Sequence, residues 1–207
     1  ARMSHEIRTP LNGVLGLAEL LRETNPSPRQ QEYIGLIENA GRTLNTLVND
    51  VLDYAKLEAG KLELEQAPFD PAALLIDCAH MFSLPASDNG DLVLVDADAD
   101  LPAQLRGDAP RLRQVLTNLL SNAIKFTRHG WIRVGARCLE QRDGRAMIEF
   151  TVSDSGIGMT REEQRRLFQN FSQASASVAQ RFGGTGLGLS ISQELVRLMG
   201  GEIELRS

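Results

Sequence analysis

Residues 111–126, RLRQVLTNLLSNAIKF, carry the most regular pattern in the chain, and Asp108 precedes them as a candidate N-cap. Asn118 and Asn122 lie one helical turn apart, and Lys125 continues the same edge. Apolar side chains occupy the other side: Leu116, Leu119, Leu120, Ala123 and Ile124. The stretch predicts an amphipathic helix with one side in a core. Taken alone, its polar side fits either a ligand site or a solvated surface.

The segments around this helix alternate between helix and strand patterns. Further helices are predicted over residues 69–82, 161–168 and 189–199, and strands over 92–95, 131–138 and 146–152. The last two strands alternate apolar and polar residues, and the turn-like residues 141–144 join them into a hairpin with one solvent-exposed face. This mixture indicates an α+β domain in which helices cover one face of a mixed sheet.

The first 66 residues have no strand pattern. Helical spacing on both sides of residues 25–28, NPSP, predicts a helix, a turn and a second helix. A second helix of about 34 residues would be roughly 50 Å long at 1.5 Å per residue, too long for the first helix to cover its apolar stripe. We therefore expect a homodimer in which two hairpins form a four-helix bundle. The alternative is a hairpin folded onto the rest of its own chain. The predicted domains are residues 1–66 and 67–207.

Composition excludes several classes of protein. The chain has 207 residues, 42% of them hydrophobic and 24% charged, which fits a folded protein. Its net charge of -5 disfavours nucleic acid as a partner. No apolar run approaches the roughly 20 residues that cross a bilayer, so no membrane contact is expected of this segment. Cys78 and Cys138 are too few for a disulfide framework, which favours a reducing, cytoplasmic setting.

Residues 4–10, SHEIRTP, give the first candidate for chemistry. His5 and Thr9 share one face of a helix, and Pro10 should bend that helix beside them. A neutral imidazole is a good phosphoryl acceptor near pH 7, and Glu6 could hold the proton of the opposite ring nitrogen. Taken alone, a single helical histidine is more often a surface or packing residue. A zinc site is excluded because the second histidine of that motif is missing.

Three other motifs suit a nucleotide. Magnesium prefers oxygen ligands and often shares them with phosphates, so the two asparagines and Lys125 fit a metal-bound triphosphate. Residues 154–158, DSGIG, place a carboxylate and two glycines at a strand end, where an adenine amino group is a plausible donor. Residues 183–190, GGTGLGLS, precede a helix and predict an anion site without the spacing of a P-loop or a dinucleotide fold. Residues 172–180 are expected to cover the nucleotide as a mobile lid.

The order of these motifs is more specific than any one of them. The chain resembles the core of a sensor histidine kinase of two-component signalling, of the hybrid subgroup, over essentially its whole length. The resemblance is carried by SHEIRTPLNG (4–13), LTNLLSNAIKFT (116–127), DSGIGM (154–159), FQNFSQ (168–173) and GGTGLGLSIS (183–192). It implies a dimerisation and histidine phosphotransfer hairpin, followed by an α/β sandwich ATP-binding domain of the histidine kinase and Hsp90-like (Bergerat) type.

The resemblance also implies roles for single residues. His5 would accept the γ-phosphoryl group of ATP, Glu6 would be its acid/base partner, and Thr9 would position water during dephosphorylation of a receiver. Asn118 and Asn122 would bind Mg²⁺, Lys125 would contact phosphate and Asp154 would read adenine. The remaining nucleotide contacts are implied for Gly156, Gly158, Arg181, Gly184, Thr185, Gly186, Leu187 and Gly188.

The implied partners are a second copy of the chain and a receiver domain, either of a response regulator or of the same hybrid protein. The implied location is the cytoplasmic portion of an inner-membrane-anchored sensor. One alternative is a kinase-like interaction module that regulates another histidine kinase by pairing through the hairpin. Another is an ATP-hydrolysing machine with the same nucleotide-binding fold, such as a chaperone or DNA-repair ATPase, which would not need His5.

Two departures from the family pattern bear on ATP binding. The final hairpin that the family places after GGEIELRS (200–207) is absent from the sequence, so we expect weaker ATP affinity. The lid carries Arg181 as its one obvious cation where many members have an additional Thr-Arg pair. Weaker clamping of the phosphates is therefore expected.

Overall fold

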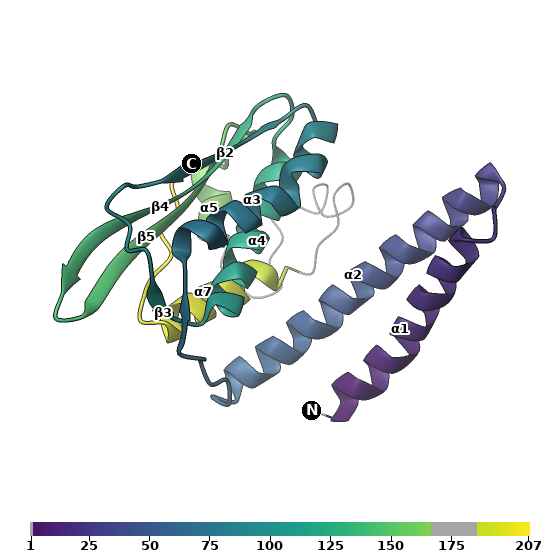
Figure 1. Cartoon of the computed structure of the whole chain (residues 1–207), viewed down its shortest axis with the longest axis horizontal. Helices are drawn as coiled ribbons and strands as arrows, with labels where there is room; N and C mark the ends of the chain where they lie inside the picture. Colours follow the sequence, from purple (N-terminus) through teal and green to yellow (C-terminus); the bar gives the residue numbers. More distant parts are fainter. Residues whose placement is uncertain (1, 167–185) are drawn as a thin grey trace. The chain divides into compact units, whose positions relative to one another are not determined.

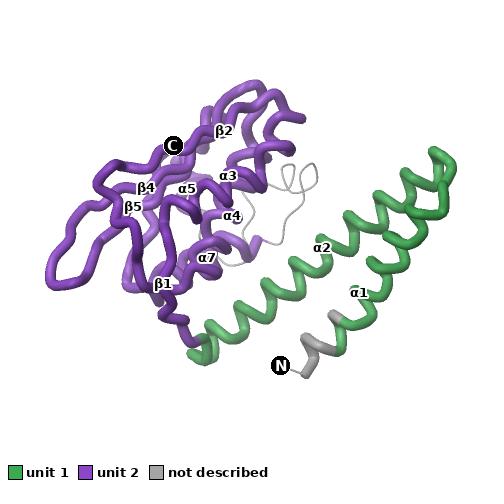
Figure 2. Tube along the Cα trace, viewed as in Figure 1, with its two compact units in different colours: residues 1–62 green, residues 63–207 purple. Residues whose placement is uncertain are grey.

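A computed structural model describes residues 2–166 and 186–207. The chain divides into two compact units, Ala1–Leu62 and Glu63–Ser207, shown in different colours in Figure 2. We call them the hairpin unit and the α+β unit. Residues 63–66, placed in the first domain by the sequence, group here with the second unit. The reason is that the Glu65 backbone N–H donates to Asp108 Oδ2 over 3.0 Å and the Arg106 guanidinium donates to the Gln66 carbonyl over 3.3 Å.

The hairpin unit consists of two helices that lie side by side, α1 (Arg2–Arg22) and α2 (Pro28–Glu58) (Figure 1). The helix α1 continues without a break through Pro10. A bond from the Ser27 backbone N–H to the Gln30 side chain, 2.8 Å long, helps to start α2. At its other end, Gly60 has a φ of +61° and the Lys61 N–H donates to the Lys56 carbonyl over 2.9 Å.

The two helices pack through small and apolar residues with one buried acid. A Cβ added to Gly41 would lie 2.6 Å from Leu15 Cδ2, so the glycine allows close packing. Glu38, 7% exposed, accepts hydrogen bonds from Arg22 (2.7 Å) and Arg42 (3.4 Å). A stripe of apolar side chains is left at least 42% exposed within this unit: Val14, Leu17, Leu20, Leu21, Leu36, Ile37, Leu44 and Val51.

The α+β unit contains a three-stranded mixed sheet in the order β2 (Leu92–Ala97), β4 (Trp131–Arg142), β5 (Arg145–Asp154). The strand β2 pairs in parallel with β4, with Leu92 opposite Trp131. The strands β4 and β5 form an antiparallel hairpin that starts with Ile132 opposite Asp154. A separate antiparallel pair joins β1 (Ala67–Phe69) to β3 (Leu105–Gly107).

Four helices are described in this unit: α3 (Pro71–Asp88), α4 (Ala109–Phe126), α5 (Arg161–Arg166) and α7 (Gly188–Leu198) (Figure 1). Helices α3 and α4 pack on one face of the sheet and bury the core, whose central members include Leu75, Cys78, Leu116, Leu120, Ile132 and Val134. The predicted α+β class, with helices on one face of a mixed sheet, is confirmed. No helix of the described residues combines the length and the apolar character that a membrane span needs.

Several helix boundaries differ from the sequence prediction, most of all those of α3. The helix predicted over 69–82 spans Pro71–Asp88. It starts later because the Asp70 side chain accepts from the N–H groups of Ala72 and Ala73, and because Phe69 belongs to β1. It also continues past Pro85. The helix predicted over 161–168 is described as far as Arg166, and the rest of that prediction lies outside the described residues.

Candidate active site

The asparagines predicted to face a ligand lie on α4, which the sequence positions through its cap and its apolar side. Asp108 Oδ1 accepts from the Arg111 backbone N–H over 2.9 Å, which confirms the predicted N-cap. Asn118, Asn122 and Lys125 are half-buried, while the apolar side of the helix is in the core. The helix therefore holds these polar groups at the border between core and surface.

Asn118 contacts the end of the glycine-rich motif. Its side-chain Nδ2 donates to Ser192 Oγ on α7 over 2.9 Å. A Cβ added to Gly188 would lie 2.4 Å from Asn118 Oδ1, so only a glycine fits at the start of α7 with this asparagine in place. Two motifs that are far apart in the sequence thus meet at one point, as a shared nucleotide site requires.

Lys125 lies near the other end of α4. Burial lowers the pKa of its ammonium group, because removal from water disfavours the charged form. Its Nζ lies 5.1 Å from the centre of the Phe126 ring. A lysine in this setting gains more from a nearby phosphate than a fully hydrated lysine does, because part of its desolvation has already occurred.

Asp154 ends β5 and begins the loop that the sequence assigned to adenine. Its Oδ1 accepts from the Gly156 N–H over 2.9 Å, and none of the described residues hydrogen-bonds to Oδ2. A Cβ on Gly156 would lie 2.5 Å from the Phe126 carbonyl oxygen, which also accepts from the Ile157 N–H. The loop is thereby held against the end of α4, one helical turn from Asn122. Gly158, two residues further on, has a φ of +67°.

The described part of the glycine-rich motif begins at Gly186, which has a φ of +70°. Leu187 is buried, and its carbonyl accepts from the Ser190 hydroxyl over 2.9 Å in the first turn of α7. The backbone N–H groups at the start of this helix suit an anion. The predicted contacts Arg181, Gly184 and Thr185, and the predicted lid 172–180, lie outside the described residues.

The predicted phosphoacceptor segment lies on α1. His5, Glu6 and Thr9 all fall within this helix, and Glu6 and Thr9 are exposed. The His5 side chain lies outside the described part of the structure. His5 and Thr9 are four residues apart on a continuous helix, so they share a face as predicted.

Comparison with known families explains why these motifs occur together. Residues 1–60 match the family model of the His Kinase A (phospho-acceptor) domain, and residues 107–207 match that of the histidine kinase-, DNA gyrase B- and HSP90-like ATPases. The chain is a sensor histidine kinase core.

Relatives of this kinase core match it along its whole length. The sensor protein GacS of Pseudomonas syringae pv. syringae is 48% identical over 100% of the chain. Hybrid signal transduction histidine kinase B of Dictyostelium discoideum is 39% identical over 99% of it. The chain spans only 23% and 10% of these two proteins. The crystal structure of full-length ShkA in complex with AMPPNP superposes with a TM-score of 0.76 and 38% identity, covering 97% of this chain and 40% of that one.

These findings confirm the family and the fold class that the sequence motifs implied. The match of residues 1–60 to a phosphoacceptor model separates the kinase core from the chaperone and DNA-repair ATPases, which were the alternative with the same nucleotide-binding fold. The comparisons give no support to the alternative of a kinase-like interaction module.

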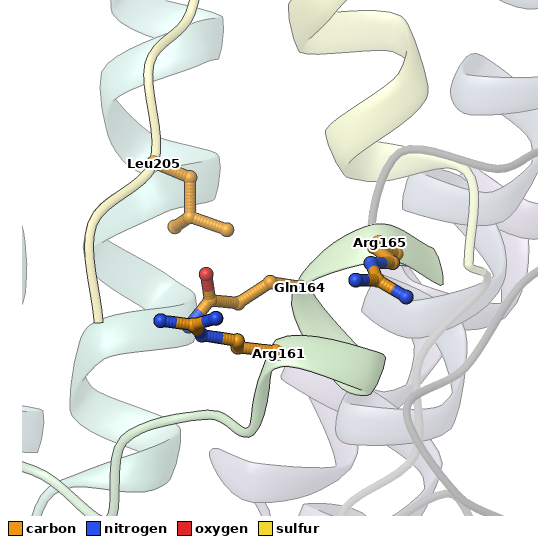
Figure 3. A pocket seen from close by; sticks show the side chains of 4 residues that line it. All are labelled: Arg161, Gln164, Arg165 and Leu205. Atoms are coloured by element: carbon orange, nitrogen blue, oxygen red, sulfur yellow. The ribbon is translucent and has the colours of Figure 1, made fainter.

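The kinase core also has a shallow pocket of about 350 Å³ beside α5 (Figure 3). Arg161, Gln164 and Arg165 line it together with Leu205 of the C-terminal segment. The Gln164 amide donates to the carbonyls of Met159 (3.0 Å) and Ser207 (3.3 Å), so this side chain joins the segment to the loop before α5. None of the predicted nucleotide contacts that the structure describes lines this pocket.

Sequence reasoning missed two serines of the kinase core. Ser192 is 2% exposed and is bonded to Asn118. Ser155 accepts from the Trp131 backbone N–H over 2.9 Å, directly after the Asp154 that was predicted to read adenine. The helical spacing that places position 192 on the same side as Leu195, Val196 and Met199 was the available signal for Ser192. The sequence held no comparable signal for Ser155.

Proposed function

We propose that this kinase core transfers the γ-phosphoryl group of Mg-ATP to His5 and then passes it to an aspartate of a receiver domain. The observation that carries the proposal is the contact between Asn118 and Gly188, which brings the asparagine helix and the glycine-rich motif to one point. The relatives named as histidine kinases, and the ShkA complex with AMPPNP, support the same assignment.

The nucleotide would lie along α4. Asp154 Oδ2, to which no residue of the described ranges hydrogen-bonds, suits the amino group of adenine, while the start of α7 and Lys125 suit the phosphates. Arg181, Gly184, Thr185 and their neighbours would complete the phosphate site.

The donor set fits Mg²⁺. No cluster of three or more His, Cys, Asp or Glu that could hold a metal occurs among residues 2–166 and 186–207, whereas the amides of Asn118 and Asn122 offer neutral oxygens. Such a pair fits a cation that takes its other oxygens from phosphates and water. When bound, Mg²⁺ neutralises charge on the phosphates during transfer.

The chemistry needs one nucleophile and one proton acceptor. A lone pair of the His5 imidazole would form the N–P bond to the γ-phosphorus as the bond from phosphorus to the bridging oxygen of ADP breaks. The ring then becomes cationic, and Glu6 would hold the proton on its other nitrogen. Because the transition state is loose and rich in charge, positioning and charge neutralisation supply most of the acceleration.

The hairpin unit, Ala1–Leu62, would serve as the dimerisation and phosphotransfer domain, and the α+β unit, Glu63–Ser207, as the ATP-binding domain. The exposed apolar stripe of α1 and α2 supports a homodimer, because a monomer would leave it in water. The receiver would belong to a response regulator or to the same hybrid protein, and Thr9 would position water when the phosphoryl group is removed from it. The protein would act as the cytoplasmic portion of an inner-membrane-anchored sensor.

Incubation with γ-labelled ATP tests the reaction. The protein should acquire a label that is lost in acid and kept in alkali, as expected of a phosphohistidine, and His5→Gln should abolish it. The matched control is His80→Gln, since His80 is an exposed histidine of the α+β unit without a predicted role. Labelling that persists in His5→Gln would overturn the assignment of the acceptor.

A titration with Mg-nucleotide tests the binding site independently of His5. Asn122→Ala and Asp154→Ala should each weaken binding by about tenfold or more, as losses of this kind usually do at a polar binding site. Binding equal to that of the wild type in both variants would show that the site is misplaced.

A further inference from the structure

The buried Ser192 is bonded to one of the two asparagines proposed to hold the Mg-nucleotide. Asn118 Nδ2 donates to Ser192 Oγ over 2.9 Å, and Ser192 is 2% exposed. The bond joins α4 to α7, and its two residues are 74 positions apart in the sequence. A hydroxyl buried this deeply keeps its place only where its hydrogen bonds are satisfied.

This bond determines where the carbonyl oxygen of Asn118 lies. The side-chain amide is planar, so when Nδ2 is held by Ser192 the direction of Oδ1 is fixed as well. Oδ1 lies against Gly188, at the start of α7, where an added Cβ would approach it to 2.4 Å. Rotation of the amide would place two N–H groups at that position instead of an acceptor.

We propose that Ser192 is a positioning residue for the Mg-nucleotide: its hydroxyl holds the Asn118 amide so that the oxygen, and not the NH₂ group, faces the phosphate side of the site. The inference rests on the proposed function, because it gives Asn118 a ligand. Residues that orient a metal-binding side chain through its second polar atom are a general feature of metal sites.

The same helix supplies a matched control. Leu195 is also buried, at 0% exposure, and lies three residues after Ser192. Its side chain is apolar and makes no hydrogen bond to Asn118, and it lies outside the glycine-rich motif. Leu195→Val and Ser192→Ala therefore each remove one side-chain heavy atom from a buried position of one helix, and only the second change frees Asn118.

The test measures equilibrium binding of ATP to the whole chain by calorimetry, at saturating Mg²⁺, at a series of Mg²⁺ concentrations and with the metal chelated. Ser192→Ala should weaken binding about tenfold at saturating Mg²⁺ and raise the Mg²⁺ concentration for half-maximal binding, because an orienting partner is lost. Binding of ATP by Ser192→Ala in chelator should stay within about twofold of the wild type, as should binding by Leu195→Val under every condition.

Two further comparisons make the result decisive. Ser192→Thr keeps the hydroxyl, and Ser192→Val has nearly the shape of the threonine variant without the hydroxyl. The threonine variant should therefore bind ATP with the Mg²⁺ dependence of the wild type, and the valine variant should not. This pair also decides the matter if Ser192→Ala does not fold. In the Asn118→Ala background, Ser192→Ala should have no further effect, because the residue is argued to act through Asn118.

The inference is overturned if Ser192→Ala, or the valine variant in its place, binds Mg-ATP as the wild type does. It is equally overturned if Leu195→Val weakens binding to the same degree, since the effect would then come from the packing of α7. Failure of the proposed function is a different result: Asn118→Ala itself would leave Mg-ATP binding unchanged. If Asn118→Ala weakens binding and Ser192→Ala does not, the site stands and only the role of Ser192 is rejected.

Discussion

Ser155 and Trp131 are joined by three hydrogen bonds: the Trp131 N–H donates to Ser155 Oγ over 2.9 Å, and the Trp131 carbonyl accepts from the Ser155 N–H over 3.0 Å and from the Ser155 hydroxyl over 3.4 Å. The first residue of β4 is thereby bonded to the loop that follows β5. Because Asp154 directly precedes Ser155, the sheet itself fixes the position of the carboxylate assigned to adenine. The structure of this loop depends on a side chain and not only on backbone pairing.

Replacement of Ser155 by alanine should reduce discrimination between bases. Without the Ser155 hydroxyl, the position of Asp154 would be less well fixed. The preference for ATP over a purine triphosphate that lacks the 6-amino group should therefore fall by about three- to tenfold, which corresponds to one hydrogen bond. Competition binding measures the ratio. Ser153→Ala, on the exposed side of β5, is the matched control and should leave the ratio unchanged. An unchanged ratio in Ser155→Ala would contradict the prediction.

Gly156→Ala should damage the same loop more severely. The new Cβ would lie 2.5 Å from the Phe126 carbonyl, which is backbone and cannot move aside as a side chain can. We expect a loss of about 1–3 kcal/mol in the free energy of unfolding, typical of overpacking, together with weaker nucleotide binding. Chemical denaturation checks the first effect. Gly144→Ala is a control for steric contact, since nothing lies within 4 Å of a Cβ there, although its positive φ adds a small cost of its own. Equal destabilisation by the two changes would argue against the steric cause.

The two oxygens of Asp108 can be tested separately. Asp108→Asn keeps an oxygen for the Arg111 N–H but loses the acceptor for the Glu65 N–H, and should cost about 1 kcal/mol of unfolding free energy. Asp108→Ala loses both bonds and the N-cap, and should cost about 2 kcal/mol. Asp70→Asn is the control, because a single oxygen of Asp70 caps α3. An asparagine variant no more stable than the alanine variant would show that the Glu65 bond carries the whole effect.

Loss of charge at Glu38 should destabilise the hairpin unit. Its carboxylate accepts from Arg22 and Arg42, and its side chain is nearly buried, while both arginines remain largely exposed. Because water can solvate both arginines once the carboxylate is lost, Glu38→Gln should lower the free energy of unfolding by only about 1–2 kcal/mol. Loss of one partner of a fully buried ion pair costs more. Thermal unfolding at a fixed protein concentration measures this. The exposed Glu32→Gln on the same helix should change the midpoint little.

Lys125 should make nucleotide binding sensitive to alkaline pH. Burial lowers its pKa, so the ammonium loses its proton at a lower pH than an exposed lysine does. Affinity for Mg-ATP should therefore fall as the pH rises through that lowered pKa, and Lys125→Arg, which stays charged, should remove this fall. In the absence of nucleotide the sign is opposite. The unfolded chain binds the proton more tightly, so the Lys125 contribution to stability rises over the same interval. Parallel pH profiles for wild type and Lys125→Arg would contradict the assignment.

The sequence predicted most of the elements that carry local signals. The helix α4 was predicted from its N-cap and its apolar side, and the hairpin of β4 and β5 from alternation around a turn. The pair β1 and β3 was missed because each strand has three residues and the two are distant in the sequence. The start of α3 was misplaced by two residues because Phe69 fits a helix or a strand equally well without knowledge of its partner.

In the candidate site, too, features with a local sequence signal were predictable and tertiary contacts were not. The positions of Asn118, Asp154 and Gly188 within their motifs were predictable, since each motif has its own pattern. Their supporting bonds were not, because Ser192 and Trp131 are contacted across tertiary distances that no local pattern encodes. Ser192 illustrates the limit: its burial could be predicted from helical spacing, but its partner could not.

The bond between Asp108 and Glu65 has a consequence for engineering. The end of α2 is closed by the bond from Lys61 to Lys56, and the α+β unit already holds Glu65, so residues 62–64 alone lie between these two anchors. A foreign hairpin joined at those three positions would leave the bond between Glu65 and Asp108 intact. Chimeras joined at residues 62–64 should keep this bond. A junction placed after residue 66 would instead replace Glu65 and Gln66, which are bonded to the α+β unit.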